Sequence, residues 1–151
     1  MEREVDLPTS LTIRPADTYA AHGTDPGQPT TGYLRFWAPL LGPTTTLLYR
    51  MLLDATDDGR SYGYVDLGHL ALDLGLGRGQ GRHATITRTW VRMERYGLLF
   101  PVPDTWGHWQ LPIHLPWLSD RQLNRLRPDL GHLERLYRTA VQDVTDLHRP
   151  Q

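Results

Sequence analysis

The chain of 151 residues contains no cysteine and no lysine, and each absence excludes a class of site. Without cysteine there is no disulfide framework and no thiolate ligand for a metal. Without lysine a Walker-type phosphate loop is excluded, because its lysine reaches the β- and γ-phosphates. No apolar run approaches the ~20 residues that span a bilayer, and the polar first residues are not typical of a signal peptide. We therefore expect a cytoplasmic protein with no membrane partner.

The composition that is present suits one globular domain with a core plus tails. Hydrophobic residues make up 39% and charged residues 22%. The net charge of −1 is unevenly distributed: residues 76–96 hold five arginines and one glutamate, a local charge of +4, so the rest carries −5. Such a segment can form a positive patch that binds phosphates. All 16 basic residues are arginine, as a GC-rich coding bias produces, so arginine abundance alone indicates little.

Residues 66–96 form the most informative segment and predict two amphipathic helices joined by a glycine-rich turn. Asp66 suits the N-cap of the first helix, and Gly75 suits a left-handed C-terminal cap. Its predicted buried stripe is Leu67, Leu70, Ala71 and Leu74. The next helix is predicted to begin at Arg82 or His83 and to end at Tyr96, with Gly97 as its C-terminal cap. Its predicted buried face is Ile86, Thr89, Trp90 and Met93, and its other face carries Thr85, Arg88, Arg92 and Arg95.

This layout is typical of a helix-turn-helix, in which one helix supports and the next is presented to DNA. A recognition helix enters the major groove with its N-terminal turns. The residues expected at base edges are therefore His83, Ala84, Thr85, Thr87 and Arg88. The residues expected at phosphates are Arg78, Arg82 and Arg92. The alternative is an ordinary solvated helix face that carries several arginines.

The loop between the two helices, residues 75–81, alternates glycine with other residues. It misses the G-x-G-x-x-G spacing, because Gln80 and Arg82 stand where a third glycine is needed. It also follows a helix rather than a strand, so a nucleotide-binding loop is excluded. Two interpretations remain open: the glycines let backbone N–H groups approach a phosphate, or they allow a tight reversal.

The preceding part of the chain predicts shorter elements. Residues 1–31 predict an irregular tail with one short strand at 11–14, and residues 32–41 predict a turn or short helix. Pro43 suits the first position of a helix that ends at 57–59, and residues 62–65 predict a short strand. The predicted buried stripe of the Pro43 helix is Leu47, Leu48, Met51, Leu52 and Ala55.

The following part predicts a β-hairpin and then further helices. Residues 98–103 and 108–113 predict the two strands, because Gly107 can take a positive φ in the turn. The turn carries Asp104 and no arginine, and it leaves Trp106 either exposed or folded onto the core. Ser119 and Gln122 predict a capping box at the start of a helix, and Leu118 and Leu123 predict a hydrophobic staple at the same helix start.

A long helix is predicted after Pro128, with apolar residues at alternating steps of four and three. These residues are Leu126, Leu130, Leu133, Tyr137, Ala140, Val144 and Leu147. The repeat fits a dimerisation element and a helix packed on its own domain equally well.

No residue pattern indicates catalysis or metal binding. The seven histidines are scattered without an H-E-x-x-H motif. Ser10, Ser61 and Ser119 stand in no nucleophile-elbow context. Asp57 and Asp58 are typical of a turn. We expect a protein that is not an enzyme and that needs no metal and no cofactor.

Residues 41–99 resemble the winged helix-turn-helix domains of bacterial and phage regulators and of plasmid replication initiators. The resemblance is carried by Leu41-Gly42-Pro43-Thr44, Asp57-Asp58-Gly59, Leu70-Ala71, Leu74-Gly75-Leu76, Thr85-Ile86, Trp90, Met93-Glu94 and Tyr96-Gly97-Leu98-Leu99. It implies a recognition helix beginning near His83 and a wing at 98–113. The chain departs from the family in a longer turn, with extra glycines between Gly77 and Gly81, and in a wing without basic residues.

The predicted fold is therefore α+β, mainly α: a winged helix-turn-helix with three helices and a β-hairpin wing over residues 32–117. The tail at 1–31 precedes it, and C-terminal helices at 118–148 follow as a candidate dimerisation element. The expected function is sequence-specific binding of double-stranded DNA, as a transcriptional regulator or a replication or partition factor of a mobile element. The alternative is a winged-helix adaptor that binds protein, without direct DNA readout, through an aromatic surface and the C-terminal helices. That surface consists of Tyr33, Trp37, Trp106 and Trp109.

Overall fold

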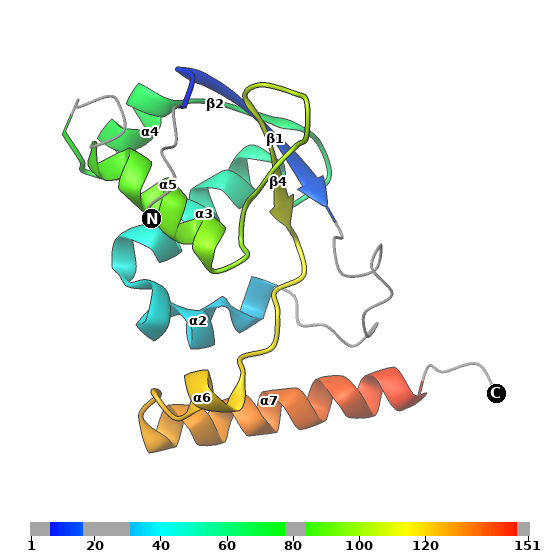
Figure 1. Cartoon of the computed structure of the whole chain (residues 1–151). Helices are drawn as coiled ribbons and strands as arrows, with labels where there is room; N and C mark the ends of the chain where they lie inside the picture. Colours follow the sequence, from blue (N-terminus) through cyan, green and yellow to red (C-terminus); the bar gives the residue numbers. More distant parts are fainter. Residues whose placement is uncertain (1–6, 17–30, 78–83, 148–151) are drawn as a thin grey trace. The chain divides into compact units, whose positions relative to one another are not determined.

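The computed structural model of the chain describes residues 7–16, 31–77 and 84–147 (Figure 1). It has helices and a mixed four-stranded sheet, so the expected α+β class is confirmed. The chain divides into two compact units, each built from two separate stretches. Unit 1 comprises Met1–Ala16 and Pro43–Ile113, and unit 2 comprises Asp17–Gly42 and His114–Gln151. Residues 32–42, which the sequence assigned to the segment 32–117, thus belong to the same unit as the C-terminal helices.

Unit 1 contains the whole sheet, whose strand order is β2-β1-β4-β3. The strands are β1 (Ser10–Ala16), β2 (Gly63–Asp66), β3 (Phe100–Pro101) and β4 (His108–Pro112). Strand β1 pairs antiparallel with β2 and parallel with β4, while β3 pairs antiparallel with β4. The short strands expected at 11–14 and 62–65 are confirmed. Strand β1 is longer than expected, and the alternation of Leu11 and Ile13 buries one of its faces in the core.

Three helices of unit 1, α3 (Pro43–Ala55), α4 (Leu67–Asp73) and α5 (Thr85–Arg95), pack on the sheet and on one another. The sheet face toward them holds Leu11, Ile13, Trp109 and Leu111, all buried. The rings of Trp90 on α5 and Trp109 on β4 meet edge to face, with centroids 5.5 Å apart. This aromatic pair packs the buried face of α5 against the sheet.

Helix α3 begins at Pro43 as expected, but its buried face differs from the predicted stripe. The buried residues are Thr45, Leu48, Tyr49, Leu52 and Leu53, whereas Leu47 is exposed. The cause is tertiary: the hydroxyl of Tyr49 donates a hydrogen bond to the carbonyl of Pro112 at 2.8 Å. Helical periodicity alone could not select this face, because apolar residues flank it on both sides.

The β-hairpin lies where the sequence predicted it, with a shorter first strand. Strand β3 has only two residues, because Pro101 and Pro103 have no backbone N–H to donate to a ladder. The turn contains Asp104 with φ 59° and Gly107 with φ 77°, so the positive φ expected at Gly107 is confirmed.

The regular elements among the described residues of unit 2 are all helices. They are a 3-10 turn (η1, Thr31–Tyr33), α2 (Leu34–Leu41), α6 (Asp120–Leu123) and α7 (Pro128–Leu147). The capping box of Ser119 and Gln122 is confirmed in both directions. The side chains of Tyr33, Phe36, Trp117 and Tyr137 form an aromatic cluster with neighbouring centroids 5.0–6.3 Å apart.

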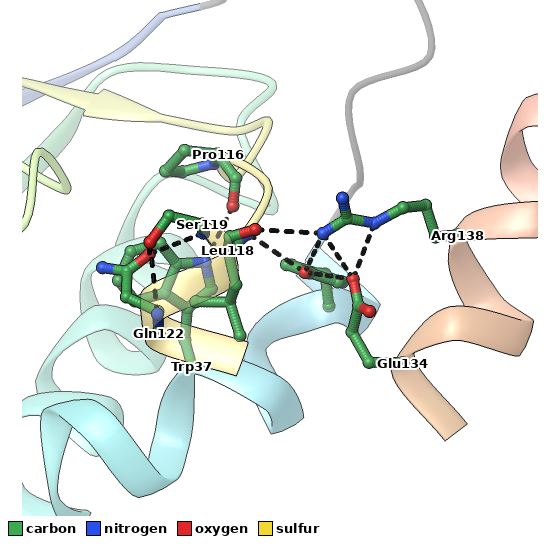
Figure 2. Close-up of polar contacts among 8 residues, drawn as sticks. Trp37, Pro116, Leu118, Ser119, Gln122, Glu134 and Arg138 are labelled. Atoms are coloured by element: carbon green, nitrogen blue, oxygen red, sulfur yellow. Dashed lines mark hydrogen bonds and ion pairs between the residues drawn. The ribbon is translucent and has the colours of Figure 1, made fainter. Parts of the chain in front are cut away.

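A buried polar network joins α7 to the start of α2 within unit 2 (Figure 2). The hydroxyl of Tyr33 donates to Glu134 Oε1 at 2.7 Å and accepts from the backbone N–H of Leu118 at 3.1 Å. Arg138 donates from Nε to the same Glu134 oxygen at 2.8 Å and from Nη2 to the carbonyl of Leu118 at 3.1 Å. Glu134 is fully buried, so this carboxylate depends on its partners for solvation.

The heptad residues of the C-terminal segment are divided between two environments. Leu126 is buried, and Leu130 and Tyr137 are half-buried, whereas Leu133 and Ala140 are exposed. The side chains at 144–147 lie outside the described residues. Helix α7 thus packs within unit 2 through part of the repeat and leaves another part on its surface.

Candidate nucleic-acid interface

Helix α5 is held rigidly by its buried face, which matches the prediction. Ile86, Thr89, Trp90 and Met93 are all buried. The hydroxyl of Thr89 donates to the carbonyl of Thr85 at 2.8 Å, so this buried polar group has a hydrogen-bond partner within the helix. The opposite face is therefore presented at a fixed rotation about the helix axis.

Three arginines, Arg88, Arg92 and Arg95, form what we call the arginine stripe on the exposed face of α5. Their spacing of four and then three residues places them on one side of the helix over about 10 Å. Thr85 is exposed at the N-terminal end of the same face. Glu94, the one acid of α5, is half-buried on the flank of the helix. The exposed face of α5 therefore carries three arginines, with its one acid at the side.

One predicted base-contacting residue does not lie on this surface. Thr87 is only 2% exposed. Its position in the helix points it toward the core rather than beside Arg88, so it is removed from the candidate interface. Three other predicted site residues, Arg78, Arg82 and His83, lie outside the described residues, as does most of the glycine loop.

Arg95 was missing from the predicted contact residues, although it completes the stripe. Its distance of seven residues from Arg88 is two helical turns, and this spacing could have identified it from the sequence. Arg92 and Arg95 also lie in the last turn of α5, where cations stabilise the helix dipole. Part of their role is therefore structural, whatever they bind.

Helix α4 is capped at both ends and α5 at its C-terminal end, whereas α5 begins at Thr85, later than the expected Arg82 or His83, and Ala84 before it provides no side-chain cap. Asp66 Oδ1 accepts the backbone N–H of His69 at 2.9 Å, as expected for an N-cap. Gly75 and Gly97 have φ of 75° and 74°. In α5, Leu98 N donates to the carbonyl of Met93 at 3.0 Å, which completes a Schellman motif.

The hairpin turn adds no cation to the stripe. Trp106 is 71% exposed, which resolves the alternative that the sequence left open. The other members of the aromatic surface predicted for a protein adaptor, Tyr33, Trp37 and Trp109, are buried. Trp37 uses its ring Nε1 to donate to the carbonyl of Pro116 at 2.9 Å. The adaptor surface is therefore wrong as predicted, because these rings build the cores of their units.

Within the part of the chain that the structure describes, no cluster of histidine and acidic side chains could hold a metal ion. The described helices include none with the length and apolarity needed to cross a membrane. Comparison of the chain with protein-family models, with curated proteins and with solved structures yields no match.

Proposed function

We propose that the chain binds double-stranded DNA through a winged helix-turn-helix in unit 1, with α5 as the recognition helix. The chain order α3, β2, α4, α5, β3, β4 is that of such a domain, with the β3–β4 hairpin as its wing. Strand β1 is an addition to this plan, because it lies between β2 and the hairpin. Fold alone does not define function, so the proposal depends on the surface of α5.

The observation that carries the proposal is the arginine stripe opposite Ile86, Trp90 and Met93. A helix anchored by one face and cationic on the other can enter the major groove without rearranging. Thr85 and Arg88 stand in the first turn, where a recognition helix meets base edges, and an arginine there can donate two hydrogen bonds to guanine. Arg92 and Arg95, further along, are suited to phosphates.

On this basis the protein acts as a sequence-specific regulator of transcription, or as a replication or partition factor of a mobile element. Exposed apolar residues on α7 support a second part of the proposal, a homodimer through the C-terminal helices. Leu133, Leu136 and Ala140 follow one another at steps of three and four residues and are all exposed. A dimer would present two copies of α5 to the two halves of a symmetric DNA site.

The test is to select preferred duplexes from a random pool with the intact chain and to measure their affinity against salt concentration. Arg92→Ala should weaken binding to all duplexes alike and reduce the salt slope by about one. Arg88→Ala should cost about 1–3 kcal/mol on the preferred duplex and relax the preference at one base pair.

Arg50→Ala is the matched control, because Arg50 is an exposed arginine on α3 that pairs with Asp54 at 3.7 Å. It removes the same charge from the same unit and should leave both sequence preference and salt slope unchanged. Equal losses of duplex affinity in all three variants would mean that the arginine stripe attracts DNA only through general charge and does not form a specific interface. A folded chain that binds no duplex would overturn the proposal and favour a protein partner.

A further inference from the structure

The sheet of unit 1 has a second face, opposite the one that the helices cover. The strand register places Tyr64 on β2 and His108 on β4 on either side of Thr12 on β1, and Gln110 beside Arg14. Because side chains alternate along a strand, these residues share the face opposite Leu11 and Ile13. We call this face, together with Tyr62 just before β2, the outer sheet face.

Two tyrosine rings dominate the outer sheet face. Tyr64 is 76% exposed and Tyr62 is 52% exposed. Residues two apart on an extended strand are separated by about 6.6 Å. The two exposed rings therefore leave the same face at neighbouring positions along the chain, and each has a π-face on which a flat aromatic group can stack.

Beside the tyrosines lies a cation that the structure holds in place. The guanidinium carbon of Arg14 is 5.5 Å from the centroid of the Tyr62 ring. Arg14 Nε donates to His108 Nδ1 at 3.0 Å, and Nη2 lies 2.8 Å from the same atom. Since Nδ1 accepts, the His108 ring carries its proton on Nε2. The bonds use part of the five-donor fork of Arg14 and leave Nη1 for an anion.

The chemistry of this face selects the class of ligand. It offers hydroxyl, imidazole, amide and guanidinium groups from Thr12, His108, Gln110 and Arg14, and Phe100 of β3 lies beside Gln110 on the same face. The centre of a protein–protein interface is instead apolar. A nucleobase has a π-face for the tyrosines and polar edges for such groups, and its phosphate suits Arg14. Asp66, the acid at the end of β2, already caps α4.

We propose that the outer sheet face binds single-stranded nucleic acid, with bases stacked on Tyr62 and Tyr64 and a phosphate on Arg14. This activity is separate from duplex binding by α5, and neither requires the other. Both surfaces belong to unit 1. A protein that has both can hold a duplex site and also a strand released from a duplex.

The test measures anisotropy of labelled oligothymidine, single-stranded and in duplex form, with the intact chain and its variants. Tyr64→Ala should weaken single-strand binding about tenfold, because stacking on an aromatic ring contributes at that level. Tyr64→Phe should retain it, since the ring remains. Arg14→Gln should weaken it and reduce its salt dependence.

The matched controls are Leu72→Ala, an exposed apolar side chain on α4, and Arg50→Gln. Neither should change single-strand binding, and none of the sheet-face variants should change duplex affinity. Thermal unfolding of Tyr64→Ala checks that the variant is folded. We expect it to be folded, because the Tyr64 ring is exposed and removing it takes little packing from the core. Lack of single-strand binding by the intact chain, or equal loss in Leu72→Ala and Tyr64→Ala, overturns the proposal.

Discussion

Tyr33 connects three parts of unit 2 through one hydroxyl group. It donates to Glu134 on α7 and accepts from the backbone N–H of Leu118, which follows β4 in the chain by only a few residues. The pKa of Tyr33 is raised to about 12; burial of the ring is the largest cause, and the nearby Glu134 carboxylate contributes to the same rise. The hydroxyl is therefore stabilised in its neutral form by the fold.

We expect this residue to make stability depend on alkaline pH. The pKa of Tyr33 is higher in the folded chain than the ordinary value of 10.0, so its contribution is complete below pH 10. It is lost as the pH rises from 10 toward 12, because only the unfolded chain ionises easily. Denaturant unfolding of the intact chain and of Tyr33→Phe at several pH values measures this. The variant should be less stable at neutral pH and should lose less stability above pH 10. Identical pH dependence in both proteins would contradict the assignment.

At the scale of elements, the capped helix ends were predictable, whereas the uncapped start of α5 and the buried faces were predicted only in part. Asp66, Gly75 and Gly97 cap helices where the sequence placed them, because capping depends on neighbours in the chain. The face of α3 was mispredicted because it depends on Tyr49 reaching Pro112, which no local pattern reveals. Thr87 was predicted at base edges because it lies in the N-terminal turns of the helix, although it is buried.

A glycine substitution tests the capping of α5. Gly97 has φ 74°, and an added Cβ would meet only the Phe100 ring, at 3.9 Å. Gly97→Ala should therefore destabilise unit 1 through backbone conformation rather than collision, by about 1–2 kcal/mol. Gly77→Ala is the control, because its Cβ meets nothing within 4 Å and no left-handed φ is required there. Urea unfolding compares the two. Equal effects at both positions would mean that the left-handed cap contributes little.

At the scale of the whole molecule, the assignment of segments to the two units could not be predicted from the sequence. Unit 2 joins residues 17–42 to 114–151, and unit 1 joins β1 to 43–113. Such groupings depend on contacts between distant segments, for example Tyr33 with Glu134, which are 101 residues apart. The arginine stripe was largely predictable because it lies on one helix. The outer sheet face was not, since β1, β2 and β4 come together only in the fold.

Self-association through α7 is the prediction that belongs to this scale. Leu136 is 55% exposed, so Leu136→Glu removes little packing within unit 2 and should not unfold it. If α7 forms the dimer, this variant should sediment as a monomer and bind symmetric duplexes more weakly than the parent. Leu72→Glu makes the same change at an exposed leucine on α4 and should remain dimeric. A monomeric parent, or a Leu136→Glu variant of unchanged mass, would contradict the proposal.

The central place of β1 also affects how the chain reaches its native state. During synthesis β1 emerges before every other strand, yet its parallel partner β4 follows much later, with Arg14 and His108 94 residues apart. Strand β2 and the hairpin have no direct pairing with each other, since β1 lies between them. Closing so long a loop is slow, because its entropy must be lost before the strands can pair. The nascent chain therefore exposes Leu11 and Ile13 until the hairpin has been synthesised. The first strand of the chain is thus among the last to complete its pairing in the sheet.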